Sequence, residues 1–180
     1  IGTRTAEMHA ALAASDDSEF EPLPFTGLYL RSIYQSLRGL AGKLDYQLQL
    51  ALPTLPEAEC QLAQTLLGAL PAEKERLHAL ADLTPSCVRI RCHGDYHLAQ
   101  LLDTGDDFVI FDFEGDSSRP LPERMLKGPA LRDVAGMLQS LCFAACAALP
   151  ASDESAAEER FALARSWYSH AAVAFLRGYM

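Results

Sequence analysis

Apolar residues recur every three or four positions through most of the first 83 residues. Between residues 26 and 52 they stand at Leu30, Ile33, Tyr34, Leu37, Leu40, Leu44 and Leu48. This spacing is typical of one face of a long amphipathic helix. Helices are also predicted over residues 3–14 and after Pro56, where Pro71 is expected to break or kink the second helix before another begins at Ala72. The first half of the chain is therefore expected to be almost entirely helical.

Polar and apolar residues alternate from Cys87 to Cys92, and this pattern predicts a short strand. Two further short strands are predicted over residues 99–103 and 108–111, because the intervening Thr104-Gly105-Asp106-Asp107 is a strong turn signal. After a loop over 115–129, helices are predicted over 131–149 and from about 155 onward. The last helix is expected to bury an apolar stripe of Trp167, Ala171, Ala174 and Phe175. The predicted fold class is α+β, mainly helical, with a small β-hairpin in the middle.

The composition narrows the classes of partner. The 180 residues are 49% hydrophobic and 22% charged, which predicts one packed globular domain and excludes a fully disordered chain. The net charge of −9 argues against a basic surface for nucleic acid. The most apolar stretch, Val134 to Leu149, is shorter than the roughly 20 residues of a membrane span, so it predicts a buried helix. We therefore expect a small-molecule or protein partner, with no nucleic acid and no membrane.

The chain has five cysteines at positions 60, 87, 92, 142 and 146, with no Cys-x-x-Cys pair. An odd count without paired spacing supports neither a disulfide framework nor a zinc site. We expect buried free thiols in a reducing compartment, which predicts a cytoplasmic location.

Two short polar segments carry the candidate chemistry. Asp95 lies in His93-Gly94-Asp95-Tyr96-His97, Gln100 follows five residues later, and Asp112 follows the apolar run 108–111. Phosphoryl transfer from ATP needs a carboxylate to deprotonate the attacking hydroxyl and oxygen ligands for magnesium. Asp95 suits the first task, and Gln100 and Asp112 suit the second if a hairpin folds them together. On a continuous strand, however, the alternating His93, Asp95 and His97 would instead form a metal triad, as in a metal hydrolase.

His-Gly-Asp with an amide five residues after the aspartate, followed by Asp112-Phe113-Glu114-Gly115, resembles the aminoglycoside-phosphotransferase-like kinases, which are relatives of protein kinases. The segment from Asp112 through Arg119-Pro120-Leu121 to the stretch 131–138 looks like the maltokinases, although Asp116-Ser117 stands where they usually have Glu-Pro. The opening Gly2-Thr3-Arg4-Thr5-Ala6-Glu7-Met8-His9 also resembles the start of their C-terminal lobe.

The resemblance implies a role for each position. Asp95 would be the catalytic base, and Gln100 and Asp112 would hold Mg²⁺. Glu114 would be a further acceptor near the metal or the sugar, and His93 and Asp133 would support the loop. ATP would be the phosphate donor, maltose the acceptor, and a trehalose synthase domain a possible fused or associated partner. From its charge alone, Arg119 could contact phosphate or sugar, or form an exposed salt bridge.

The resemblance also predicts that residues 1–180 are the C-terminal lobe of a kinase-like fold. A glycine-rich loop and a Val-Ala-Ile-Lys-like strand are absent from this sequence, so the 180 residues are expected to be inactive alone. Two other interpretations stay open. The lobe could serve another acceptor, such as an aminoglycoside, choline or homoserine, or it could be a non-catalytic assembly module beside a glycosidase domain.

Overall fold

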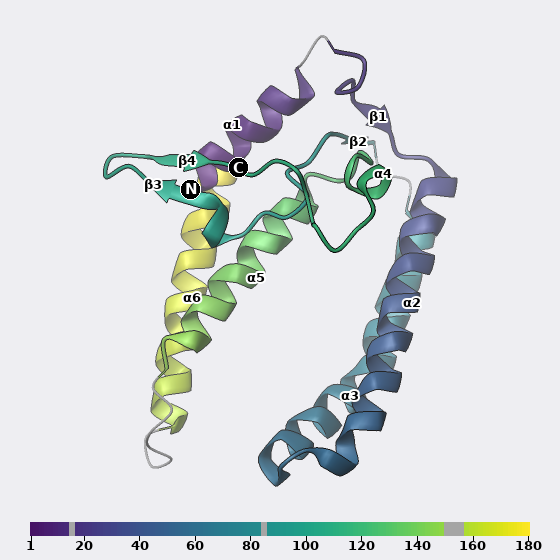
Figure 1. Ribbon diagram of the computed structural model, residues 1–180, viewed down its shortest axis with the longest axis vertical. Helices are drawn as coiled ribbons and strands as arrows, with labels where there is room; N and C mark the ends of the chain where they lie inside the picture. Colours follow the sequence, from purple (N-terminus) through teal and green to yellow (C-terminus); the bar gives the residue numbers. More distant parts are fainter. Residues whose placement is uncertain (15–16, 84–85, 150–156) are drawn as a thin grey trace. The chain divides into compact units, whose positions relative to one another are not determined.

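A computed structural model describes residues 1–14, 17–83, 86–149 and 157–180 (Figure 1). The chain divides into two compact units, one formed by residues 1–23 with 88–180 and the other by residues 24–87. The first unit contains α1 (Gly2–Ala13), β2 (Val88–Arg89), β3 (Leu101–Asp103), β4 (Phe108–Ile110), α4 (Leu121–Arg124), α5 (Leu131–Ala147) and α6 (Ala157–Tyr179). The second contains α2 (Gly27–Ala51) and α3 (Glu57–His78). Helices dominate and the strands are short, which confirms the predicted α+β, mainly helical class.

The second unit is a helical hairpin. Thr26 caps the N-terminus of α2, because its hydroxyl accepts a hydrogen bond from the Tyr29 N–H at 3.2 Å. Lys74 on α3 forms an ion pair with Asp45 on α2 at 2.7 Å, and two 3₁₀ turns, Leu52–Thr54 and Ala79–Asp82, follow the helices. The predicted apolar stripe of α2 is only partly covered within this unit, because Leu30 is buried whereas Leu40 is 64% exposed.

The predicted helix break at Pro71 is wrong, because α3 continues through this residue. Proline removes one backbone N–H donor but keeps a helical φ, so a long helix can contain it if its neighbours hold both sides in place. Before Pro71, Ala63 and Leu70 are buried and lie two turns apart on the same face of α3. After Pro71, the ion pair between Lys74 and Asp45 at 2.7 Å ties α3 to α2.

The core of the first unit lies where α5 and α6 pack together with the segment before β3. The core residues are Tyr96, Val134, Met137, Leu141 and Phe175, and Met137 has no exposed surface. Two glycines allow close approaches to this core. A Cβ atom on Gly2 would lie 2.1 Å from the Phe175 carbonyl oxygen, where α1 meets α6, and one on Gly136 would lie 2.6 Å from the Tyr96 carbonyl oxygen.

The predicted stripe of α6 is confirmed in part. Phe175 is buried and Ala171 packs against the core, whereas Trp167 is 50% exposed and Ala174 is exposed. The helix also buries Ala164 and Ala172, on the face that meets α1 and α5. None of the described helices is long and apolar enough to span a membrane.

The cysteine prediction holds for the absence of disulfides among the five thiols, which are all free, but it is wrong for burial. Cys92 is buried, whereas Cys87, Cys142 and Cys146 are exposed and Cys60 is partly buried. Cys142 and Cys146 lie four residues apart in the apolar C-terminal half of α5, where the sequence does not show which positions are exposed.

β3 and β4 form the predicted hairpin, with Leu101 opposite Ile110, Leu102 opposite Val109 and Asp103 opposite Phe108. Leu101 and Ile110 pack against the core, and Leu102 and Val109 on the other face are about half exposed. The first predicted strand is reduced to β2, which pairs with β1 (Leu23–Pro24). The loop predicted over 115–129 contains the short helix α4.

Candidate active site

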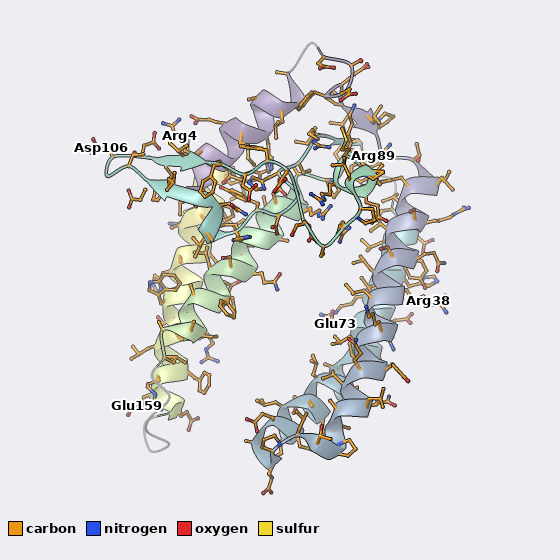
Figure 2. All side chains as sticks on the ribbon, viewed as in Figure 1. Arg4, Arg38, Glu73, Arg89, Asp106 and Glu159 are labelled. Atoms are coloured by element: carbon orange, nitrogen blue, oxygen red, sulfur yellow. The ribbon has the colours of Figure 1, made fainter. Side chains whose placement is uncertain are left out.

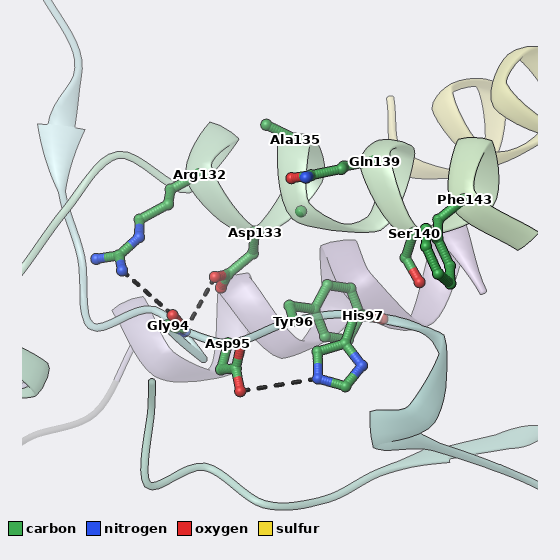
Figure 3. Close-up of a pocket in the computed structure, with 11 residues that line it drawn as sticks. Gly94, Asp95, Tyr96, His97, Arg132, Asp133, Ala135, Gln139, Ser140 and Phe143 are labelled. Atoms are coloured by element: carbon green, nitrogen blue, oxygen red, sulfur yellow. Dashed lines mark hydrogen bonds and ion pairs between the residues drawn. The ribbon is translucent and has the colours of Figure 1, made fainter. Parts of the chain in front are cut away.

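The loop 93–100 joins β2 to β3 and lies against the first turn of α5. Asp133, in that turn, is 1% exposed. One of its carboxylate oxygens, Oδ2, accepts the His93 N–H at 2.7 Å, and the other, Oδ1, accepts the Gly94 N–H at 3.0 Å (Figure 3). Charge-assisted bonds of this kind are stronger than neutral ones. Asp133 therefore fixes the backbone of His93 and Gly94, the two residues that precede Asp95.

A histidine that the sequence did not single out completes the environment of Asp133. His9 on α1 lies 3.1 Å from the Asp133 carboxylate through Nε2 and 3.0 Å from the Tyr179 hydroxyl through Nδ1. Because a carboxylate accepts hydrogen bonds, Nε2 is the nitrogen that donates. His9 is buried, and these contacts connect α1, α5 and the end of α6 beneath the loop. In the sequence, His9 appears only at the end of the segment from Gly2 that resembles the start of a C-terminal kinase lobe, with no role assigned to it.

His93 links the loop to the segment that follows β4. Its Nε2 donates to the Phe111 carbonyl at 2.8 Å, and its Nδ1 accepts the Asp95 N–H at 3.4 Å. Its ring lies 4.9 Å from that of Phe113. Both ring nitrogens are therefore engaged by the protein, which is incompatible with the alternative metal triad. Within the described ranges, no group of three or more His, Cys, Asp or Glu side chains is arranged to hold a metal ion.

Asp95 is the candidate base, and its carboxylate is half-exposed at the edge of a pocket. The nearest charged or titratable partner shown for it is His97, whose Nε2 lies 3.7 Å from the Asp95 oxygen (Figure 3). The backbone of Asp95 is held through His93, so the side chain is free to meet a ligand while its main chain is fixed. This arrangement suits a carboxylate that accepts a proton from a bound hydroxyl.

Gln100 and Asp112 are twelve residues apart in sequence, and the hairpin brings them together. The Gln100 amide nitrogen lies 3.2 Å from the Asp112 carboxylate. A 3₁₀ turn, Leu98–Gln100, places Gln100 at the start of β3, and Phe111 donates its N–H to the Gln100 carbonyl at 3.2 Å. Asp112 has a φ of 65°, a left-handed conformation that turns the chain sharply after β4. Amide and carboxylate oxygens are ligands that Mg²⁺ accepts, so these two residues fit a magnesium site.

The pocket has a volume of about 560 Å³ and lies between the loop and one face of α5 (Figure 3). Arg132 donates to the Gly94 carbonyl at 3.3 Å at one end. Toward the other end the Ser140 hydroxyl accepts the Leu98 N–H at 3.1 Å, and Phe143 is 75% exposed. The pocket therefore combines a cation, an imidazole, a carboxylate, an amide and an aromatic ring, which is a mixed lining suited to a polar small molecule.

The structure places Glu114 and Arg119 outside this pocket. Glu114 is exposed two residues after Asp112. Arg119 donates to Asp116 at 3.2 Å, and Arg124 donates to the Arg119 carbonyl at 2.8 Å. The exposed salt bridge that the sequence allowed for Arg119 is therefore present in the structure. Contact of Arg119 with phosphate or sugar stays a prediction.

Burial changes the titration of three groups around Asp133. Burial, with a smaller effect of the Asp133 charge, raises the pKa of the Cys92 thiol to about 12. Burial also raises the pKa of Tyr96, although the hydrogen bond with the Thr5 hydroxyl at 2.8 Å opposes this change. The pKa of Tyr179 is raised by burial and by the Asp133 charge. These groups therefore stay neutral beneath the loop at physiological pH.

Two known proteins with sequences similar to this chain are both glucosamine kinases. A glucosamine kinase of Streptacidiphilus jiangxiensis is 31% identical over 141 residues, which cover 78% of this chain and 28% of that protein. A glucosamine kinase of Mycolicibacterium smegmatis is 45% identical over 56 residues, covering 31% of this chain and 14% of that protein. The chain therefore spans less than a third of the length of either relative.

Two solved structures that resemble this chain are also of glucosamine kinases. A glucosamine kinase crystal structure matches with a TM-score of 0.69 and 27% identity, over 99% of this chain and 39% of that one. A glucosamine kinase in complex with glucosamine, ADP and inorganic phosphate matches with a TM-score of 0.68 and 26% identity, over 99% of this chain and 40% of that one. The model of the phosphotransferase enzyme family matches residues 1–170. Because this family model matches nearly the whole of the described sequence, the chain belongs to the phosphotransferase enzyme family.

Proposed function

We propose that the chain is the catalytic lobe of an ATP-dependent kinase that phosphorylates a hydroxyl group of a small sugar. The observation that carries the proposal is the position of the 3.2 Å Gln100–Asp112 pair at the base of the hairpin that follows the Asp95 loop. Phosphoryl transfer requires from this part of a kinase a general base and ligands for Mg²⁺, which Asp95 and the Gln100–Asp112 pair would supply.

Each residue has a defined task in this proposal. Asp95 accepts the proton of the attacking hydroxyl, and the bonds from His93 and Gly94 to Asp133 keep the loop in place while it does so. Gln100 and Asp112 would hold Mg²⁺, which supplies positive charge for the phosphate oxygens when bound. Because the carboxylate of Asp95 is half-exposed, it can receive a proton without first leaving a buried ion pair.

The outer face of the hairpin supports nucleotide binding. Leu102 and Val109 form a directly opposed, half-exposed apolar pair on the face turned away from the core. A flat apolar surface of this kind suits an aromatic base. The chain spans about 40% of the length of the solved relatives, so we propose the activity for the protein that carries this chain, with residues outside it gripping the phosphates. The 180 residues alone are expected to be inactive.

Glucosamine is the first candidate acceptor, because it is the substrate named for the relatives in sequence and structure. Maltose is the second candidate, because the segment from Asp112 to Leu138 resembles maltokinases. If maltose is the acceptor, we also expect a fused or associated trehalose synthase domain. An aminoglycoside, choline or homoserine would place the chain on another branch of the family.

The test is a kinase assay on the full-length protein with ATP, Mg²⁺ and each candidate acceptor. Wild type is expected to form a sugar phosphate, and Asp95→Asn is expected to lose this activity while still binding nucleotide. Asp106→Asn, in the exposed hairpin turn, is the matched control and should retain activity. Unchanged phosphorylation by Asp95→Asn would refute the mechanism, and a fully inactive wild type would support a non-catalytic assembly module instead.

A further inference from the structure

One face of α5 lines the whole length of the pocket beside Asp95. Arg132, Gly136, Gln139 and Phe143 follow one another at steps of three or four residues along this face. Residues at these steps lie above one another on a helix. A ligand in this pocket would therefore contact the polar and apolar side chains of a single face of α5.

Most polar groups on this face are already committed to the protein. Arg132 bonds the Gly94 carbonyl, Ser140 bonds the Leu98 N–H, and both oxygens of Asp133 accept backbone donors. Gln139 differs, because its exposed side chain makes no hydrogen bond to any part of the chain that the structure describes (Figure 3). An amide can both donate and accept, so Gln139 has its full hydrogen-bonding capacity available to a ligand.

The position of Gln139 is fixed relative to the loop. Gly136 touches the loop, since a Cβ atom there would lie 2.6 Å from the Tyr96 carbonyl oxygen. Gln139 lies one turn further along α5, about 5 Å along the helix axis. Phe143 follows after another turn and presents an exposed ring. A ligand whose reacting hydroxyl meets Asp95 would extend along this face, past the amide and toward the ring.

We propose that Gln139 determines acceptor specificity by hydrogen-bonding a polar substituent of the sugar away from the reacting hydroxyl, with Phe143 contacting the apolar face of the ring. This inference rests on the proposed kinase function and names the surface that selects the acceptor. The neutral amide of Gln139 can hydrogen-bond either a hydroxyl or an amino group of the sugar. A carboxylate at the same position would favour a charged ammonium group over a hydroxyl.

The experiment measures kcat/KM of the full-length protein for an amino sugar and for its hydroxyl analogue, glucosamine and glucose. In Gln139→Glu the ratio of the two values should rise about tenfold, which corresponds to about 1.4 kcal/mol. Gln139→Leu should raise the KM for both acceptors about tenfold and leave kcat and the KM for ATP unchanged. Ser166→Glu, on the exposed surface of α6, adds the same charge away from the pocket and should leave the ratio as in wild type.

An unchanged ratio in Gln139→Glu, or an unchanged acceptor KM in Gln139→Leu, would overturn the inference while leaving the kinase function intact. If wild type phosphorylates no sugar, the proposed function fails, and the inference is then decided by binding. NMR titration of the 180-residue chain with glucosamine and glucose should show that Gln139→Glu prefers glucosamine more strongly than wild type does. Equal preference in both proteins, or no binding of either sugar, would overturn the inference as well.

Discussion

Asp133→Asn is the sharpest test of how this fold holds its loop. Asparagine has nearly the same shape as aspartate, so the substitution changes hydrogen bonding and charge with little change in packing. In the native protein three donors point at the carboxylate: the His93 N–H, the Gly94 N–H and His9 Nε2. An asparagine has one accepting oxygen, and its amide nitrogen must then face a donor.

The cost follows from these contacts. If the asparagine oxygen keeps His93 and His9, the Gly94 N–H faces an amide NH₂ group, and an unsatisfied buried donor costs about 1–3 kcal/mol. The two remaining bonds become neutral instead of charge-assisted, which loses about 1 kcal/mol each. The sum is a destabilisation of about 3–5 kcal/mol, consistent with breaking a buried charged network.

The measurement is thermal and urea unfolding of the 180-residue chain, together with hydrogen exchange of the His93 and Gly94 amides. For a chain of this size, each 1 kcal/mol lowers the Tm by about 2–4 °C, so a fall of about 6–20 °C is expected in the first unit. The Gly94 amide should lose most of its protection. Hydrogen exchange assigns the effect to this unit, because the helical hairpin over 24–87 forms a separate compact unit.

The matched control is Asp106→Asn, which makes the same chemical change in the exposed turn of the β-hairpin. It should change the free energy of unfolding by less than about 0.5 kcal/mol. If Asp133→Asn is as mild as this control and the Gly94 amide stays protected, the carboxylate does not hold the loop and the reasoning is refuted.

Three further predictions follow from the site and its surroundings. Asp95→Asn should lower kcat of the full-length kinase about 10²–10⁴-fold, as measured with saturating sugar, because general base catalysis supplies that factor. Iodoacetamide at pH 8 should label Cys142 within the native chain and spare Cys92, whose pKa is raised to about 12 by burial, and equal labelling in mass spectra would contradict this. Arg4 (labelled in Figure 2) forms an exposed ion pair with Asp107 that lowers the pKa of Asp107 to about 2. The stabilising effect of this pair should be complete above the ordinary pKa near 4 and disappear as pH falls toward 2, as followed by carboxyl NMR shifts.

Local sequence patterns were sufficient to predict most elements of this fold. The spacing of apolar residues predicted the long helices, and the Thr104–Asp107 turn predicted the hairpin that β3 and β4 form. The same hairpin explains why Gln100 and Asp112 could be expected to meet, since a turn of known length fixes which residues lie at its base.

Features that depend on contacts between residues far apart in the chain could not be predicted from local sequence patterns. His9 gains its partners from residues 124 and 170 positions away, so no local pattern indicates it. The exposed position of Trp167 depends on how α6 meets its neighbours, and a helix apolar on several sides does not specify which side is buried. α3 continues through Pro71, with buried Ala63 and Leu70 before it and the Lys74–Asp45 ion pair after it, and this pairing is not a local feature of the sequence.

The sequence indicated Asp112 as a candidate site residue but did not predict its backbone conformation. Its φ of 65° costs about 1–2 kcal/mol for most residues with a side chain, and aspartate is among those that tolerate it. Glycine would adopt this turn with less strain, but glycine has no carboxylate. The chain therefore combines an unfavourable backbone with a carboxylate that bonds Gln100 and that we propose as a magnesium ligand. A conflict between local preference and final structure is expected where a residue is kept for its chemistry. By the same argument, Asp112→Gly should preserve the hairpin and the protection of its amides while abolishing Mg²⁺-dependent phosphorylation by the full-length protein.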